Sequence, residues 1–363
     1  SPIERSTQVH RTRFNLEIYS ISGVQQVIDA RRVEKEVERV REELGMPVLT
    51  PPRIVDVRID QDKSLLHIIA EDRPDKAAAL GAGGMVLHKA ASLLGFRKAF
   101  ITSKRDIELK QSRVASSLSA LLALGKTSLP QAKRVIEARL APLLENELRF
   151  PHSDMLQMDP IEEAGVAVAY SGGVDSTAML VAVSKVGLKP TAVTVHPGNW
   201  MIPPETLRIM ERVTSRLGVK NVLLDGAGYD EILGLASEGI VHPCGRCHRL
   251  TEKLISSWAL QNGFGVVCFG DLLPTGRHAV YSTGGILRFN LGALAMSKRE
   301  TGEISKRHGH PGMHFYFGCP LLRSAQRKHR HLQYLSIYRV LRECHSGILE
   351  PAQALRYVKS IIG

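Results

Sequence analysis

Residues 166–180, VAVAYSGGVDSTAML, say more about the fold than any other stretch of the chain. An apolar run typical of a buried strand is followed by a Ser-Gly-Gly turn and by a helix that begins near Asp175. Glycines let the backbone approach a ligand closely, and a helix start presents unpaired N–H groups and the positive end of the peptide dipoles. The arrangement therefore favours an oxyanion, and a phosphate fits best.

Strands and helices alternate after this loop. Apolar runs predict strands at residues 191–196, 221–225 and 265–270, and amphipathic spacing predicts helices at 204–217 and 249–262. Such a βαβα order indicates an α/β domain whose parallel sheet carries helices on both faces. Ligands of these sheets bind beyond the carboxyl ends of the strands. One nucleotide pocket could gather the four strand ends, which carry Ser171, His196, Asp225 and Gly270-Asp271.

The loop is not the common nucleotide-binding loop, because G-x-x-x-x-G-K-[ST] does not occur. The pattern S-G-G-x-D-S resembles the signature of the PP-loop ATP pyrophosphatases, which have an adenine nucleotide α-hydrolase-like fold. Members of that superfamily cut ATP between the α- and β-phosphates and adenylate a substrate. The resemblance implies an ATP site with Mg²⁺ assisted by Asp175 or Asp271. Its nucleotide-binding residues would be Ser171, Gly172, Gly173, Asp175, Ser176, His196 and Gly270.

The five cysteines are an odd number in a chain that reads as cytosolic, so metal or redox chemistry is expected rather than a disulfide framework. Cys244 and Cys247 form a C-x-x-C pair that could bind zinc, act as a redox dithiol or hold an iron–sulfur cluster. Cys268 lies inside an apolar run, where a cysteine is usually a small hydrophobe. Cys319 lies in a Gly-Cys-Pro loop, and Cys344 is on the C-terminal helix. Further candidate partners are His242 and His248.

The S-G-G-x-D-S loop, the later C-x-x-C and a lone Cys-Pro together resemble the tRNA thiolation branch of the PP-loop enzymes. Proteins of that branch use three cysteines to hold a [4Fe–4S] cluster beside the ATP site. The resemblance implies Cys244, Cys247 and Cys319 as metal ligands, and Asp175, Asp271 and Cys319 as catalytic residues. Residues 269–276, FGDLLPTG, replace the Gly-His-Asn-Leu-Asp-Asp spelling usual in that branch.

The N-terminal part predicts a separate α+β module. Its expected elements are a helix at 24–44, strands at 54–59 and 65–70, a helix from Pro74, a second helix to Leu94 and a strand at 98–101. Over residues 24–103 this order resembles a type II KH domain, whose G-x-x-G loop clamps about four single-stranded nucleotides. The resemblance implies an RNA-binding loop of Gly81, Ala82, Gly83 and Gly84. Ala82 and Gly83 stand where strong binders are usually basic.

The chain is long enough, at 363 residues, for two or three domains. We expect an N-terminal extension over residues 1–23, a KH-like domain over 24–109, a helical connector over 110–160 and a PP-loop domain with a basic helical end over 161–363. No apolar run approaches the ~18 residues that span a membrane, and no secretory pattern opens the chain. We therefore expect a cytoplasmic protein with no membrane partner.

The formal net charge of +12 points to a polyanionic partner. The excess is concentrated in residues 298–363, where 12 Lys and Arg face 4 Asp and Glu. Within that region the RNA-facing residues are expected to be Arg323, Arg327, Lys328 and Arg330.

The sequence thus predicts an ATP-dependent tRNA thiolase acting on uridine or cytidine. The base carbonyl oxygen attacks the α-phosphate, pyrophosphate leaves, and sulfide then displaces AMP, with Lys298 or Arg299 stabilising the charge. The sulfur donor would be inorganic sulfide or a sulfur-carrier protein, and a homodimer is possible. A second hypothesis keeps the adenylation but makes the C-x-x-C a zinc site, with a persulfide on Cys268 or Cys344, or an amine, as nucleophile. A third is a nucleotide-regulated RNA-binding adaptor.

Overall fold

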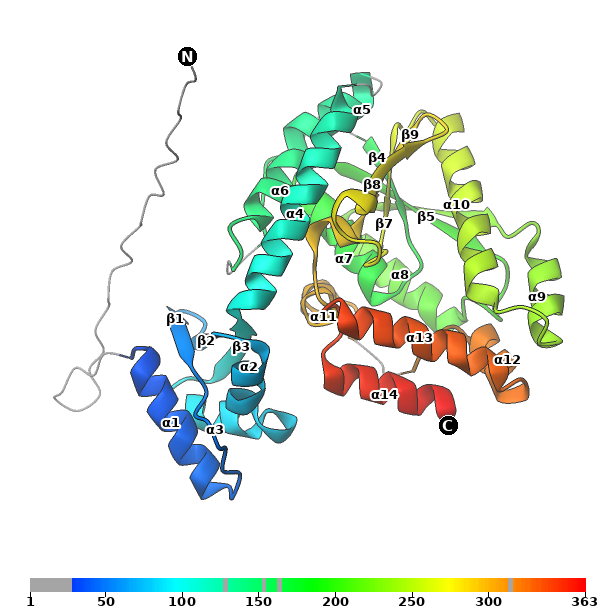
Figure 1. The fold of residues 1–363 in the computed structure, drawn as a ribbon. Helices are drawn as coiled ribbons and strands as arrows, with labels where there is room; N and C mark the ends of the chain where they lie inside the picture. Colours follow the sequence, from blue (N-terminus) through cyan, green and yellow to red (C-terminus); the bar gives the residue numbers. More distant parts are fainter. Residues whose placement is uncertain (1–27, 127–129, 152–154, 162–164, 313–315) are drawn as a thin grey trace, which may run out of the picture. The chain divides into compact units, whose positions relative to one another are not determined.

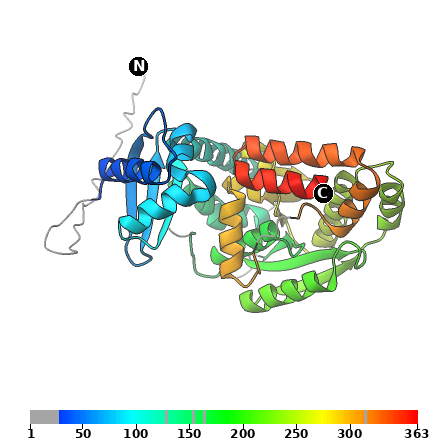
Figure 2. The same cartoon turned by 90° about the horizontal axis from the view of Figure 1, so that it is seen from below.

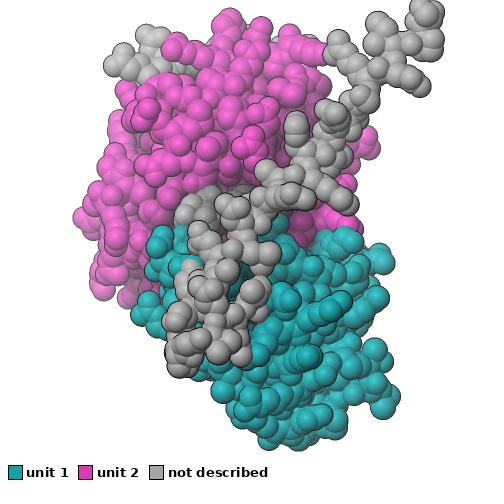
Figure 3. All heavy atoms as spheres, turned by 90° about the vertical axis from the view of Figure 1, so that its left-hand side faces the viewer, with its two compact units in different colours: residues 1–105 teal, residues 106–363 magenta. Residues whose placement is uncertain are grey.

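The structure is a computed structural model that describes residues 28–126, 130–151, 155–161, 165–312 and 316–363. The predicted N-terminal extension, residues 1–23, and the first turn of the predicted helix at 24–44 lie outside the described residues. The chain divides into two compact units, Ser1–Arg105 and Asp106–Gly363, which Figure 3 colours separately.

The first unit is a three-stranded sheet covered by helices. Strand β1 (Ile54–Asp60) pairs antiparallel with β2 (Leu65–Ala70), and β2 pairs parallel with β3 (Lys98–Ser103). Helix α1 (Ala30–Glu43) buries Val33, Val37 and Val40, whose spacing puts them on one stripe facing this sheet. The unit therefore has its own hydrophobic core.

A glycine turn joins the two helices that follow β2. Helix α2 (Arg73–Leu80) begins with a capping box of Asp72 and Asp75, and α3 (Met85–Leu93) begins after a 3₁₀ turn, Ala82–Gly84. Gly81 has φ +69°, and a Cβ there would lie 2.3 Å from Val86 Cγ2. Only glycine fits this position, because both the backbone angle and the space exclude a side chain.

The second unit is built on a six-stranded sheet in the order β6-β5-β4-β7-β9-β8. Five strands run parallel: β4 (Gly165–Ala169), β5 (Lys189–His196), β6 (Lys220–Asp225), β7 (Val266–Phe269) and β9 (Ile286–Asn290). The predicted α/β fold with a parallel sheet and helices on both faces is confirmed (Figure 1). Neither β9 nor its antiparallel partner β8 (Val280–Thr283) was predicted, although Gly284-Gly285 between two β-rich runs is a hairpin signal.

Alternate residues of β4 serve the two faces of this sheet. Val166 and Val168 pack into the core that includes α7 (Val174–Lys185) and α8 (Pro204–Leu217). Ala167 faces the opposite core, to which α9 (Tyr229–Ser237) and α10 (Pro243–Gln261) contribute. Because both of its faces are covered, β4 is apolar throughout, as central parallel strands are.

The remaining helices complete the second unit. Helix α4 (Lys104–Gly125), α5 (Pro130–Val135), a π-helical turn (Ile136–Leu140) and α6 (Ala141–Glu147) precede β4. After the sheet come α11 (Lys298–Arg307), α12 (Pro320–Lys328), α13 (His331–His345) and α14 (Pro351–Ile362). Helices α13 and α14 lie side by side in both cartoon views (Figures 1 and 2) and share a small apolar cluster. In the described part of the chain, no helix combines the length and apolarity needed to cross a membrane.

Candidate nucleotide and cysteine site

The strand order places a ligand crevice at the end of β4. The chain moves outward from β4 through β5 to β6, and then returns to the other side of β4 to form β7. The connections on either side of β4 therefore leave in opposite directions, which opens a crevice at the carboxyl ends of β4 and β7. The loop that begins at Ser171 follows β4, and Gly270-Asp271 follows β7.

The loop after β4 is a tight turn into α7. The Ser176 hydroxyl donates to the Gly173 carbonyl at 3.0 Å, and the Ser171 N–H donates to the Ser176 hydroxyl at 3.3 Å. Gly172 has φ +71°, and a Cβ there would lie 2.6 Å from Met210 Cγ on α8. Gly173 is the N-cap of α7 and, among the described residues, no side chain caps it. The first N–H groups of α7 are thus available to an anion, with the helix dipole behind them.

Gly270 allows the end of β7 to approach this turn. A Cβ at Gly270 would lie 2.6 Å from the Ser176 nitrogen and 2.8 Å from its Cα, closer than real contacts permit. The predicted nucleotide-binding positions Ser171, Gly172, Gly173, Ser176 and Gly270 are therefore brought together by backbone packing.

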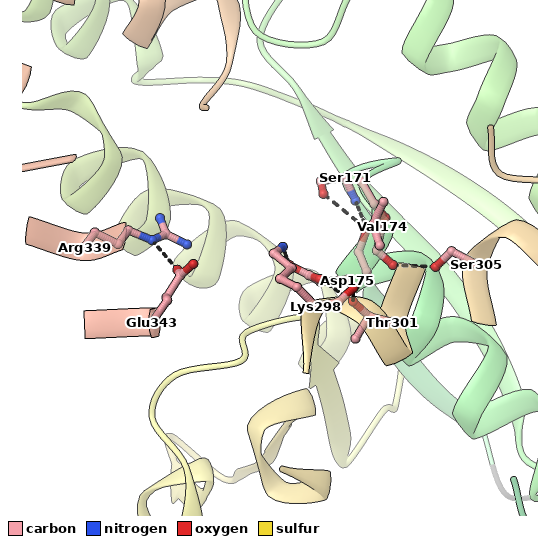
Figure 4. Close-up of polar contacts among 10 residues, drawn as sticks. Ser171, Val174, Asp175, Lys298, Thr301, Ser305, Arg339 and Glu343 are labelled. Atoms are coloured by element: carbon pink, nitrogen blue, oxygen red, sulfur yellow. Dashed lines mark hydrogen bonds and ion pairs between the residues drawn. The ribbon is translucent and has the colours of Figure 1, made fainter. Parts of the chain in front are cut away.

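Helix α11 clamps the start of α7 (Figure 4). Asp175 forms an ion pair with Lys298 and accepts a hydrogen bond from the Thr301 hydroxyl at 3.0 Å. The Ser305 hydroxyl donates to the Val174 carbonyl at 2.7 Å. Burial lowers the pKa of Lys298, but the charge of Asp175 and its hydrogen bond outweigh burial and raise it. Lys298 therefore stays charged beside residues 171–176, whose turn and helix start we call the anion cradle.

A buried histidine supports the same turn. His310, which is 3% exposed, lies 3.1 Å through Nε2 from the Gly172 carbonyl and accepts the Gly312 N–H at Nδ1. Because Nδ1 is an acceptor, Nε2 carries the proton and donates to the carbonyl. Sequence reasoning missed Thr301, Ser305 and His310, since nothing local marks a helix that packs on a loop more than 120 positions earlier.

Asp271 lies in a cationic setting at the end of β7. Arg288 of β9 donates to it at 3.0 Å, and His248 Nε2 lies 3.6 Å away. Burial is the largest influence on the Asp271 pKa and raises it. The charges of His248 and Arg339 lower this pKa and the charge of Asp175 raises it, and the net effect is a raised pKa. Burial is also the largest cause of the lowered His248 pKa.

Arg288 has further partners at the end of β7. It pairs with Glu252, and its guanidinium stacks 3.7 Å from the centre of the Phe269 ring. Sequence reasoning did not find Arg288.

His196 ends β5, one strand away from the loop. Its Nε2 is buried and, among the described residues, has no hydrogen-bond partner. An orphaned buried donor or acceptor is costly, and a polar ligand would relieve that cost. Asp225, at the end of β6, is exposed.

The three predicted ligand cysteines come from two helix starts. Cys244 and Cys247 are the second and fifth residues of α10, and Cys319 is the N-cap of α12. Ser336 of α13 joins both helices, because His242 Nε2 lies 3.0 Å and Gln326 Nε2 2.6 Å from its hydroxyl.

The three cysteines are close enough for their charges to interact. Burial raises the pKa of Cys244 to about 11, a rise that Arg339 opposes and Cys319 strengthens. Burial, and then the charges of Cys319 and Cys244, raise the pKa of Cys247 to about 12. Three such thiols are the donor set for a soft metal or an iron–sulfur cluster, which would hold them as thiolates. Within the described ranges, however, no three His, Cys, Asp or Glu side chains stand at metal-binding spacing.

The other two cysteines lie apart from this group. Cys268 is fully buried in β7, where burial raises its pKa to about 12, as expected of a small core hydrophobe. Cys344 packs in the apolar cluster between α13 and α14.

The charge of Arg339 influences groups in both parts of the candidate site. Arg339 of α13 donates to Glu343 at 2.9 Å (Figure 4). The Arg339 side chain is 60% exposed. Its charge acts on the pKa values of both Cys244 and Asp271. The charge of Asp175, in the loop after β4, raises the pKa of Asp271. The charge of Arg339 therefore influences both the Cys244 thiol and the Asp271 carboxyl, a link that no sequence pattern indicated.

The predicted RNA-facing residues lie on and after α12. Arg327, Lys328 and Arg330 are exposed and Arg323 is half-buried. Arg323, Arg327 and Lys328, with Pro320 and Ser324, line a surface hollow of about 460 Å³. In the first unit, Gly81, Ala82, Gly83 and Gly84 form the turn between α2 and α3.

Comparisons with known proteins give one relative by sequence and more distant ones by structure. No protein-family model matches the chain. An uncharacterized protein of Methanocaldococcus jannaschii is 28% identical over 270 residues, which cover 74% of this chain and 99% of that protein. The U34-tRNA thiolase NcsA of Methanococcus maripaludis, solved with its [4Fe–4S] cluster, is similar with a TM-score of 0.33 and 13% identity over 60% of this chain and 76% of that one. A phosphoadenylyl-sulfate reductase of Candida auris, solved with phosphate, has a TM-score of 0.28 and 13% identity over 50% of this chain and 84% of that one.

Proposed function

We propose that the chain is a PP-loop ATP pyrophosphatase that adenylates a nucleobase carbonyl of tRNA and replaces its oxygen with sulfur. The observation that supports this most is that the charge of one residue, Arg339, lowers the pKa of both Cys244 and Asp271. The cysteines and the end of β7 are therefore proposed to belong to one site. The first unit, with its glycine turn between α2 and α3, is proposed as a KH-like module that binds RNA.

In the proposed reaction the N–H groups at the start of α7 hold the phosphates of ATP, and Lys298 neutralises the developing charge. The base oxygen bonds to the α-phosphorus as the bond to pyrophosphate breaks. A hydrosulfide then bonds to the activated carbon, AMP leaves with the oxygen, and the proton goes to solvent. Asp175 is already paired with Lys298, and Asp271 with Arg288. A carboxylate that assists Mg²⁺ must therefore exchange a side-chain cation for the metal.

The cysteines fit the proposed cofactor by donor type, and a cluster would have to draw the three thiols together from the positions in which they stand. A [4Fe–4S] cluster held by Cys244, Cys247 and Cys319 would leave one iron without a protein ligand, where a hydrosulfide can be presented. A bound metal would have to supply the stabilisation of the thiolates, because burial raises the pKa of Cys244 to about 11 and that of Cys247 to about 12.

A substitution at Cys319 tests adenylation and sulfur transfer separately. We expect Cys319→Ala to abolish thiolation of unmodified tRNA while ATP-dependent pyrophosphate release with tRNA stays within a few-fold of the parent chain. Cys344→Ala, in the cluster between α13 and α14, is the matched control and should keep both activities. Loss of both activities in Cys319→Ala alone would instead assign Cys319 a structural role.

The cofactor itself is tested on protein purified without oxygen. Broad visible absorbance with iron and acid-labile sulfide is the expected result. Zinc without iron would contradict the cluster and favour the hypothesis of a structural zinc site. An unchanged thionucleoside profile in tRNA from cells lacking the protein would contradict thiolation, and no pyrophosphate release with ATP and bulk tRNA would contradict adenylation.

A further inference from the structure

Helix α13 has two apolar faces, and the described part of the chain covers only one of them. Ile337, Val340 and Cys344 pack into the cluster shared with α14. On another face Tyr334, Tyr338 and Leu341 are 73%, 61% and 55% exposed. Their spacing of four and three residues places them on one stripe of the helix. We refer to Tyr334, Tyr338 and Leu341 as the tyrosine stripe.

The surroundings of the tyrosine stripe are basic. The Arg342 guanidinium lies 5.8 Å from the Tyr338 ring, within the range of a cation–π contact. Arg330, at the start of α13, and Lys328 before it are exposed. The only acidic residue of α13 is Glu343, which is buried and paired with Arg339. A partner of this face must therefore be anionic and must also offer flat apolar surfaces.

Single-stranded nucleic acid has that chemistry, because its bases stack on aromatic rings while its phosphates attract arginine. A duplex does not, since its base faces are already stacked. A second copy of this chain is disfavoured, because pairing two such faces would bring like charges together.

We infer that Tyr334 and Tyr338 are stacking platforms for two unpaired bases of the RNA substrate, with Arg342 on an adjacent phosphate. This inference rests on the proposed function, in which the substrate is RNA. The next residue after Tyr338 is Arg339, which acts electrostatically on Cys244 and Asp271. The tyrosine stripe and the guanidinium that influences the proposed reaction site are therefore carried by the same helix, and the stacked bases are proposed to belong to the strand that carries the modified base.

The test is the affinity of the full-length protein for an unmodified tRNA transcript and for a mixed-sequence single-stranded oligoribonucleotide, measured by fluorescence anisotropy. We expect the double variant Tyr334→Ala/Tyr338→Ala to bind both at least about tenfold more weakly, because each base–aromatic stack is worth a several-fold change or more. The double variant Tyr334→Phe/Tyr338→Phe keeps the rings and should bind like the parent chain. Leu355→Ala on α14, which removes a side chain that is also 55% exposed, is the control for loss of apolar surface.

Salt dependence separates stacking from charge. The tyrosine variants should leave the slope of log affinity against log salt unchanged, whereas Arg342→Ala should reduce its magnitude by about 0.7. If the parent chain binds no RNA, the proposed function fails together with this inference. If the parent chain binds RNA and the alanine variant binds it equally well, only the inference is overturned. Loss of self-association or of binding to anionic vesicles, with RNA affinity unchanged, would also overturn it.

Discussion

Asp175 shows how single residues at the site depend on distant parts of the chain. Its carboxylate is held by Lys298 and Thr301, which lie 123 and 126 positions later. Lys298 is 18% exposed, so Asp175 and its partner form a partly buried pair whose charges are only weakly screened. The pair keeps a cation beside the first turn of α7, where a phosphate would also be drawn.

Gly270 gives a sharp test at the residue scale. Gly270→Ala would force a Cβ to within 2.6 Å of backbone, so either β7 or the start of α7 must move. We expect a loss of about 1–3 kcal/mol in the free energy of unfolding, measured with urea, and weaker ATP binding by calorimetry. Gly234→Ala on α9 is the matched control, since a Cβ there meets no described atom within 4 Å and alanine favours a helix. Equal stability of both variants with the parent chain would contradict the close approach of β7 to the loop.

At the scale of elements, α11 is the helix on which the site depends, and a buried ion cluster fixes it. Lys110 of α4 lies 2.9 Å from Glu300 of α11 and 3.2 Å from Glu147 of α6. Lys110 and Glu147 are 7% and 1% exposed. Glu300 also closes the capping box with Ser297 at the start of α11. The connector helices thus hold in place the helix that carries Lys298 and Thr301.

This cluster predicts a specific loss of stability in acid. Burial alone would raise the Glu300 pKa, but Lys110 and the hydrogen bonds from Ser297 lower it from 4.5 to about 2. A depressed pKa stabilises the fold above the pKa of the unfolded chain, and that stability is lost as the pH falls from about 4.5 to about 2. The contribution is roughly 3 kcal/mol. Glu300→Gln should lower stability at pH 7 and flatten this part of the curve of unfolding free energy against pH. An unchanged slope in the variant would contradict the assignment.

At the scale of the whole molecule, the two units each have a core of their own. The apolar cluster around α1 and the three-stranded sheet contains only residues of the first unit, and three further clusters contain only residues of the second. A unit with its own core can fold alone.

This independence predicts the behaviour of a shortened chain. A protein of residues 106–363 should fold cooperatively, keep ATP-dependent pyrophosphate release with tRNA at saturating RNA, and bind tRNA about tenfold more weakly, because one of two linked binding modules is gone. Circular dichroism and anisotropy measure the two properties. Full tRNA affinity without the first unit would contradict an RNA-binding role for the turn between α2 and α3.

Several features could be predicted because their causes are local. The strand, turn and helix around Ser171 depend on neighbouring residues, since glycines set the turn and the apolar run sets the strand. The G-x-x-G turn was found for the same reason. The hairpin of β8 and β9 had a local signal in Gly284-Gly285 that sequence reasoning did not use.

The partners of the site residues could not be predicted from any pattern. Nothing near Asp271 in the sequence indicates Arg288 of β9, and nothing near Cys244 indicates Arg339 of α13. Each of these pairs forms only when a strand or helix packs at one particular place. A single charged residue carries no sequence pattern from which its distant partner could be predicted.

The sequence by itself determined the alternation of strands and helices, the anion-binding turn and the types of donor atoms, because dihedral preferences and apolar spacing act over a few residues. Only the tertiary structure decided that β4 lies between β5 and β7, that α11 clamps Asp175, and that Cys319 lies close enough to the C-x-x-C pair of α10 to raise the pKa of both its thiols. These arrangements arise from burying several faces at once, and such packing joins residues that no local rule connects.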